Sequence, residues 1–160
     1  MAIAVGDRIP DVTLTTMTSE GPKPVETGEV LGSGKVVLFA VPGAFTPTCS
    51  DYHLPGFVVR ADDLRAKGVT TVACVSVNDA FVMGAWGSSQ GVGDSVVLLA
   101  DGNADFAKAM GLELDGSGFG MGTRSQRYAA VIEDGVVTHL AVEPKSGLDV
   151  SSADAILAVL

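Results

Sequence analysis

Three short, valine-rich apolar runs alternate with segments long enough to form helices, and this alternation is the strongest constraint on the fold. The runs are KVVLFAVP (35–42), TTVACVSV (70–77) and SVVLLAD (95–101). Short, continuously apolar runs of this kind are typical of strands that are buried on both faces of a sheet. Strands that alternate with helices predict a parallel sheet with helices on its faces. We therefore expect an α/β fold.

The C-terminal part of the chain predicts a different arrangement. RYAAVIEDGVVTHLAVE contains two β-rich runs around Asp134 and Gly135, which is a strong hairpin signal. SSADAILAVL then predicts a closing helix that is capped by Ser151 or Ser152. The core-facing residues of this helix are expected to be Ala155, Ile156 and Val159.

The segments together predict a single domain over residues 1–160, with a mixed central sheet flanked by helices and a C-terminal hairpin and helix. Residues 5–31 contain strand-like pieces such as VTLTTMT and a stretch rich in glycine and proline. Their pattern does not assign them a definite structure.

Charge and composition limit the possible partners. The formal net charge of −9 disfavours nucleic acid and anionic membrane surfaces, since both require basic patches. The apolar runs are too short to cross a bilayer, and the N-terminus lacks the pattern of a signal peptide, so we expect a cytoplasmic protein. The two cysteines are expected to be reduced thiols. Two cysteines and two histidines without a short ligand pair predict neither a zinc site nor another cofactor.

Cys49 lies in VPGAFTPTCS, directly after the first buried run. A helix is expected to begin here, either with Thr46 as N-cap and Pro47 at the first helical position, or with Thr48 as N-cap and Asp51 completing a capping box. In both cases Cys49 lies in the first turn, where free backbone N–H groups and the helix dipole favour a thiolate. The same helix is expected to kink at Pro55.

Residue spacing alone also allows purely structural roles for the cysteines and for the other candidate residues. A lone cysteine is more often a small buried apolar residue, and burial without reactivity is the expectation for Cys74, inside VACVSV. Thr46 could be only an N-cap, and Arg127 only a solvated or ion-paired arginine. His53, four residues after Cys49, could favour the thiolate, but a surface or packing role is preferred.

The string PGAFTPTC (42–49) contains the P-x-x-x-T-x-x-C signature of the peroxiredoxins, and VPGAFTPTCSDYHLPGF closely resembles the type II, or peroxiredoxin-five-like, subfamily. The resemblance continues over nearly the whole chain, in SVNDAFVMGAW, LLADGNADFAKAMGLELD, GTRSQRYAAVIEDG and SSADAILAVL. It implies a thioredoxin-like fold and a thiol peroxidase that reduces hydrogen peroxide and alkyl hydroperoxides.

The resemblance also implies four catalytic positions. Cys49 would be the peroxidatic cysteine, which attacks one peroxide oxygen and becomes a sulfenic acid. Thr46 would hydrogen-bond the peroxide, and Pro42 would shield the pocket from water. Arg127 would stabilise the thiolate and the developing negative charge, with Arg124 a weaker candidate for a second cation. His139 is interpreted as structural.

The sulfenic acid must be reduced for turnover. Some animal-type members carry a resolving cysteine in a G-L-T-C-S context, whereas this chain has GLDVS, with Val150 at the matching position. The leading hypothesis is therefore a one-cysteine cycle, in which glutathione with glutaredoxin, or thioredoxin, reduces Cys49. A disulfide between Cys49 and Cys74 is the alternative, although it requires Cα atoms within about 7 Å.

Two other classes of function stay open. One is a cysteine hydrolase that pairs Cys49 with His53 or His139 and an aspartate. The other is a redox-sensing module without turnover. A dithiol oxidoreductase is disfavoured because the chain has no C-x-x-C pair. The type II resemblance also implies a homodimer, to which Phe45 and Phe119 are plausible apolar contributors.

Overall fold

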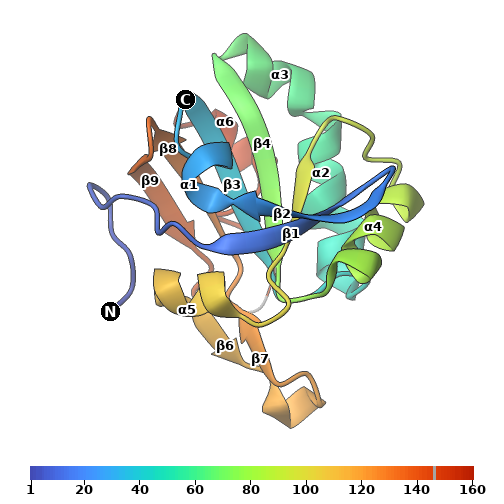
Figure 1. The fold of residues 1–160 in the computed structure, drawn as a ribbon. Helices are drawn as coiled ribbons and strands as arrows, with labels where there is room; N and C mark the ends of the chain where they lie inside the picture. The colour runs from blue at the N-terminus through green and yellow to red at the C-terminus, as the bar shows by residue number, and fades with distance from the viewer. Residues whose placement is uncertain (146) are drawn as a thin grey trace.

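The computed structural model describes residues 1–145 and 147–160 and contains a mixed seven-stranded sheet (Figure 1). The strand order is β2-β1-β5-β4-β3-β8-β9. β3, β4 and β5 are parallel, and the other neighbouring strands are antiparallel. The strands of this sheet are β1 Thr13–Thr18, β2 Gly21–Glu26, β3 Lys35–Val41, β4 Val69–Ser76, β5 Val97–Ala100, β8 Tyr128–Glu133 and β9 Val136–Val142.

The three parallel strands are the three predicted apolar runs, each found within two residues of its expected bounds. Alternate side chains of β3 enter two different cores because successive residues of a strand point to opposite faces. Phe39 packs on one face with helices α2, α3, α4 and α6, and Leu38 packs on the other face with α5. The helices are α1 Thr27–Val30, α2 Leu54–Val59, α3 Ala61–Ala66, α4 Ala80–Ser89, α5 Asp105–Met110 and α6 Ala153–Leu157. Burial of strand β3 on both faces explains why its sequence is continuously apolar.

The N-terminal segment forms the β1–β2 hairpin and the short helix α1. Strand β2 contains Pro22 and Pro24, which cannot donate backbone hydrogen bonds, and it lies at the edge of the sheet. Strand β1 joins β2 to β5, and the Thr16 hydroxyl donates to the Leu98 carbonyl at 2.9 Å. Residues 5–31, for which the sequence predicted no definite structure, therefore extend the sheet on the β5 side.

The C-terminal elements confirm the predicted hairpin and helix. Asp134 and Gly135 have φ angles of 50° and 83°, and they form the turn between β8 and β9. Ser152 caps α6 by accepting from the Ala155 N–H at 3.1 Å. Ile156 is buried as expected, but α6 ends at Leu157 and Val159 is exposed. The prediction that Val159 faces the core was therefore wrong, because the helix stops before this residue.

A small antiparallel ribbon extends away from the main sheet at the bottom of Figure 1. It consists of β6 Glu113–Asp115, a 3-10 turn at Ser117–Phe119, and β7 Thr123–Ser125. Within the described ranges, none of the helices is long and apolar enough to cross a membrane.

Candidate active site

Cys49 lies just beyond the carboxyl end of β3, in the first turn of a helical segment that begins at Pro47. The Thr46 carbonyl accepts the first helical hydrogen bond, from the Ser50 N–H at 3.0 Å, so Thr46 occupies the N-cap position. Thr48 has helical dihedral angles and makes no side-chain cap. Of the two predicted helix starts, the structure therefore has the one with Pro47 at the first helical position.

The turn that follows Cys49 is a π-helix, η1 Cys49–His53. The Leu54 N–H donates to the Cys49 carbonyl, five residues back. Pro55 has no N–H to donate, and the helix continues through it to Val59 as α2. Single π-turns inside α-helices are frequent at functional sites, and this one lets the helix tolerate Pro55 while Cys49 and His53 are both fully buried.

Sheet register brings Arg127 to Cys49 across 78 positions of sequence. Ala40, near the end of β3, pairs with Tyr128, the first residue of β8. Arg127 directly precedes Tyr128 and therefore lies at the same edge of the sheet as the end of β3. Its Nη2 donates to Cys49 Sγ at 3.0 Å, and only 9% of the residue is exposed. A guanidinium thus lies against the sulfur, in surroundings where few waters screen its charge.

His53 supports this guanidinium instead of facing solvent. Its Nδ1 accepts from Arg127 Nη1 at 2.7 Å, and its Nε2 lies 2.9 Å from the Ser151 carbonyl. Its ring packs beside Phe39 and Phe57, with centroid distances of 4.8 and 5.6 Å. Burial, and then the charge of Arg127, lower the pKa of His53 to about 3. Of the predicted surface or packing role, the structure confirms packing, because the ring is buried beside Phe39 and Phe57. A neutral His53 supplies no positive charge to the sulfur.

Thr46 and Pro42 lie in the loop between β3 and the Cys49 helix, and both are half-buried. The Thr46 hydroxyl donates to the Gly43 carbonyl at 2.7 Å, so its oxygen lone pairs can accept another hydrogen bond. Arg124 donates to the Pro42 carbonyl at 3.4 Å and to the Met121 carbonyl at 3.0 Å. Arg124 therefore connects the loop to the β6–β7 ribbon. Both of these hydrogen bonds go to backbone carbonyl oxygens and not to Cys49.

Comparison with known proteins assigns the family. The Redoxin family model matches residues 4–157. The chain is 52% identical over 163 residues to the chloroplastic peroxiredoxin-2E-2 of Oryza sativa subsp. japonica, covering 99% of this chain and 72% of that protein. The chain belongs to the peroxiredoxin family. It is therefore a thiol-dependent peroxidase, as the type II resemblance implied.

Solved structures agree with this assignment. Reduced Prx3 of Vibrio vulnificus in complex with H2O2 superposes with a TM-score of 0.94 at 55% identity, over 98% of each chain. A protein from Burkholderia cenocepacia described as a putative thioredoxin reductase superposes with a TM-score of 0.98 at 47% identity, over 100% of this chain and 99% of that one. These likenesses confirm the thioredoxin-like α/β fold.

The second thiol of this peroxiredoxin has different surroundings. Cys74 is fully buried in β4 beside Phe39 of β3, and both cysteines are free. Burial, and then the proximity of Cys49, raise the pKa of the Cys74 thiol well above its usual value. Cys74 therefore remains protonated at neutral pH and is a poor nucleophile.

The arrangement around the histidines does not match a cysteine hydrolase. His53 bonds to Arg127 and to a backbone carbonyl, whereas a hydrolase would require a carboxylate to orient the ring. His139 lies in β9, where it pairs with Val131 of β8, three residues along the strand from Tyr128 at the Arg127 end. In the part of the chain that the structure describes, no group of three or more His, Cys, Asp or Glu side chains is arranged to hold a metal.

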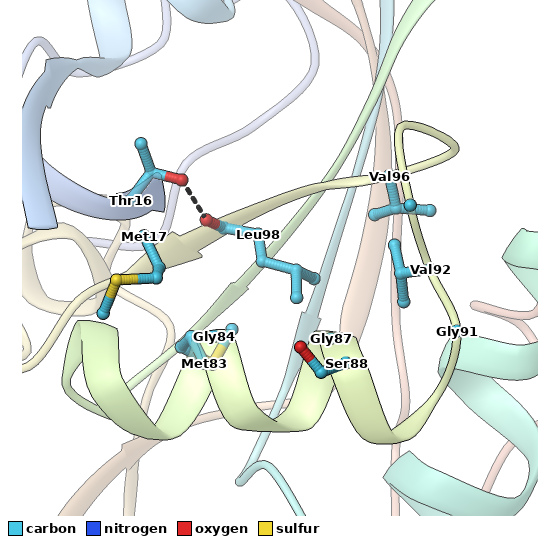
Figure 2. Close-up of a pocket in the computed structure, with 11 residues that line it drawn as sticks. Thr16, Met17, Met83, Gly84, Gly87, Ser88, Gly91, Val92, Val96 and Leu98 are labelled. Carbon is cyan, nitrogen blue, oxygen red and sulfur yellow. Dashed lines mark hydrogen bonds between the residues drawn. The ribbon is translucent and has the colours of Figure 1, made fainter. Parts of the chain in front are cut away.

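A hollow of about 370 Å³ lies between β1, β5 and α4, and Cys49 is not among the residues that line it (Figure 2). Its lining includes Met17, Met83 and Leu98, and none of its eleven described residues is ionisable. Its lining offers only the hydroxyls of Thr16 and Ser88 and no titratable group that could activate them, so it is a poor candidate for the chemistry.

Proposed function

We propose that the Cys49 thiolate attacks the nearer oxygen of a peroxide, with Arg127 as the cation that stabilises the reaction. A sulfur–oxygen bond forms, the O–O bond breaks, and the leaving hydroxide or alkoxide takes a proton from solvent. Cys49 is oxidised to a sulfenic acid while the peroxide is reduced to water or an alcohol. The observation that carries this proposal is the 3.0 Å contact between Arg127 Nη2 and Cys49 Sγ. A guanidinium keeps its proton throughout, so it can stabilise both the thiolate and the departing oxygen.

Thr46 and Pro42 complete the proposed peroxide site. The Thr46 hydroxyl hydrogen is committed to the Gly43 carbonyl, so its oxygen would accept the O–H of the bound peroxide. This contact would align the O–O bond with the sulfur for in-line attack. Pro42 would cover the approach and limit the access of water.

We propose a one-cysteine cycle for the return to the thiol. The sulfenic acid on Cys49 condenses with an external thiol to give a mixed disulfide and water, and a second thiol then releases Cys49 by exchange. Glutathione with glutaredoxin, or thioredoxin, would supply these thiols. Two observations support this cycle. The Cys74 thiol is buried with a raised pKa, and Val150 stands where, by the resemblance, some animal-type members of the subfamily carry a resolving cysteine.

Access for the reductant requires a local opening. Cys49 has no exposed surface, so a protein thiol can reach its sulfur only after the residues that cover it have moved. A reducing compartment such as the cytoplasm is the proposed location because both halves of the cycle require reduced thiols. A homodimer is also proposed, supported by Phe45 and Phe119, whose side chains are 54% and 87% exposed.

Intact-mass analysis after one equivalent of hydrogen peroxide tests the cycle. Without glutathione the expected product gains one oxygen, and with glutathione it carries one glutathione adduct on Cys49. The Cys49→Ser protein, treated in parallel, should show neither change. A loss of two hydrogens in the wild-type protein would instead indicate a Cys49–Cys74 disulfide and would overturn the one-cysteine cycle.

A further inference from the structure

The carboxylate of Glu143 organises the loop that follows β9. A single oxygen, Oε2, accepts from the Asp149 N–H at 2.9 Å, from the Ser151 N–H at 2.9 Å and from the Ser151 hydroxyl at 2.6 Å. These three bonds fix the position of Ser151, which is fully buried. Val150 lies between the two held residues, so the loop that could have carried a resolving cysteine is bound to the end of the hairpin.

The held loop presents a carbonyl to the active site. The Ser151 carbonyl lies 2.9 Å from His53 Nε2, and a carbonyl can only accept, so Nε2 carries the hydrogen of the neutral ring. The opposite nitrogen, Nδ1, then has a free lone pair and accepts from Arg127 Nη1. The other tautomer would place an N–H of His53 against an N–H of Arg127, and this contact would be lost.

The β8–β9 hairpin places Glu143 and Arg127, the first and last residues of this series of contacts, side by side. Tyr128 pairs with Val142, so the next residues outward, Arg127 and Glu143, are neighbours, and the Glu143 N–H donates to the Arg127 carbonyl at 2.9 Å. Backbone pairing alone would leave the long Arg127 side chain several rotamers. The bond to His53 selects the one that brings Nη2 to the sulfur of Cys49.

We propose that Glu143 is a positioning residue for the peroxidase reaction, which holds Ser151 so that His53 keeps Arg127 on the sulfur of Cys49. The three hydrogen bonds from the loop to the Glu143 carboxylate carry this positioning. The negative charge of Glu143 also favours a higher pKa of His53, against the larger effects of burial and Arg127. The inference rests on the proposed role of Arg127 and extends it to a residue that touches neither sulfur nor peroxide.

The test measures the rate constant for the first oxidation of Cys49 by hydrogen peroxide in stopped flow, as a function of pH. Glu143→Ala should slow this step about tenfold and raise the midpoint of the pH–rate curve by about one unit, because a displaced cation stabilises the thiolate less. Glu143→Gln retains an oxygen acceptor of the same length and should remain within threefold of wild type. Glu133→Gln, at the other end of the same hairpin, is the matched control and should leave the rate unchanged.

Two further variants separate positioning from a loss of folding. In the His53→Phe background the link to Arg127 is already absent, so Glu143→Ala should add almost nothing to the effect of His53→Phe. Ser151→Ala removes one of the three bonds and keeps the carbonyl, and it should slow the step about twofold even if Glu143→Ala folds poorly.

Two results would overturn the inference. In the first, Glu143→Ala reacts with peroxide as fast as Glu133→Gln. In the second, the double variant His53→Phe/Glu143→Ala loses rate by the product of the two single fold-losses, which would mean that the two residues act independently. Arg127→Gln separates a failure of the proposed function from a failure of the positioning role of Glu143. If Arg127→Gln reacts like wild type, the proposed function fails. If Arg127→Gln is slow while Glu143→Ala and Ser151→Ala are normal, only the positioning role of Glu143 fails.

Discussion

Cys49 and Cys74 are two thiols with the same burial and different neighbours. Both are fully buried and both contribute to the core on the same face of the sheet. Cys49 begins a helical turn and accepts a hydrogen bond from Arg127, whereas Cys74 lies within β4 among apolar side chains. Burial raises the pKa of the Cys74 thiol well above its usual value. Cys49 differs in accepting a hydrogen bond directly from the Arg127 guanidinium, at 3.0 Å. We propose that the cation placed against the sulfur of Cys49 sets the difference in reactivity between the two thiols.

The largest expected effect comes from removing one thiol at a time. Cys49→Ser should abolish peroxide turnover because no other group can form the sulfenic acid. Cys74→Ser should retain turnover within about threefold, since a buried protonated thiol does not take part. Peroxide consumption with glutathione and glutaredoxin, or with thioredoxin, measures both. Loss of turnover in Cys74→Ser with a normal first oxidation would make Cys74 the resolving cysteine.

Acid should destabilise the fold through His53. Its folded pKa of about 3 lies below the unfolded value of 6.5, so the unfolded chain binds a proton that the folded protein excludes. This contribution to stability is complete above pH 6.5, decreases as the pH falls, and is lost near pH 3, on the order of 5 kcal/mol in total. Urea unfolding from pH 7 to 4 should therefore show a steeper loss in wild type than in His53→Gln. Parallel curves would contradict a neutral buried His53.

Replacing the cation should bring the two thiols closer in reactivity. Arg127→Gln removes the charge and should slow the first oxidation of Cys49 about a hundredfold, the usual cost of losing one stabilising donor at a reacting centre. Arg127→Lys keeps the charge, but a single ammonium cannot reproduce the fork that contacts both Cys49 and His53, so it should recover only part of the rate. Stopped-flow oxidation by hydrogen peroxide measures both variants, and a rate for Arg127→Gln equal to wild type would be inconsistent with this account.

The smallest expected effect concerns the packing of Cys74. Cys74→Ala removes one sulfur from the core and should lower the free energy of unfolding by about 1–2 kcal/mol while leaving peroxidase activity unchanged. Equilibrium unfolding in urea measures the change, and Ala73, on the opposite face of β4, provides a packing control through Ala73→Gly. A large loss of activity at unchanged stability would give Cys74 a role in chemistry.

The sequence predicted some features well because their signals are local. Apolar runs identified the parallel strands, and the Asp134-Gly135 pair identified the hairpin. The Thr46-Pro47 pair gave one of two predicted starts for the Cys49 helix, and the structure has that one. Strand β2 was not predicted, because its prolines are tolerated only by its place at the sheet edge, which is a property of the assembled sheet.

The partners of Cys49 depend on tertiary structure and have no local signal. Arg127 came from the family resemblance, since residue spacing does not show that β8 starts beside the end of β3. The i, i+4 spacing of His53 placed it on the face of Cys49, but its contact with the Ser151 carbonyl joins residues 98 positions apart. A carboxylate such as Glu143 near a Ser-containing loop is common in sequences, so its contact with Ser151 became visible only in the folded chain.

Competition between the two thiols inside one wild-type molecule tests the central claim most directly. The protein is treated at neutral pH with less than one equivalent of hydrogen peroxide and quenched into denaturant that contains a sulfenic-acid trap, and peptide mapping then quantifies the trap on each cysteine. We predict at least a hundredfold more trap on Cys49 than on Cys74, because only Cys49 has Arg127 against its sulfur. Comparable labelling of the two cysteines would contradict the conclusion that this guanidinium sets the difference in their reactivity.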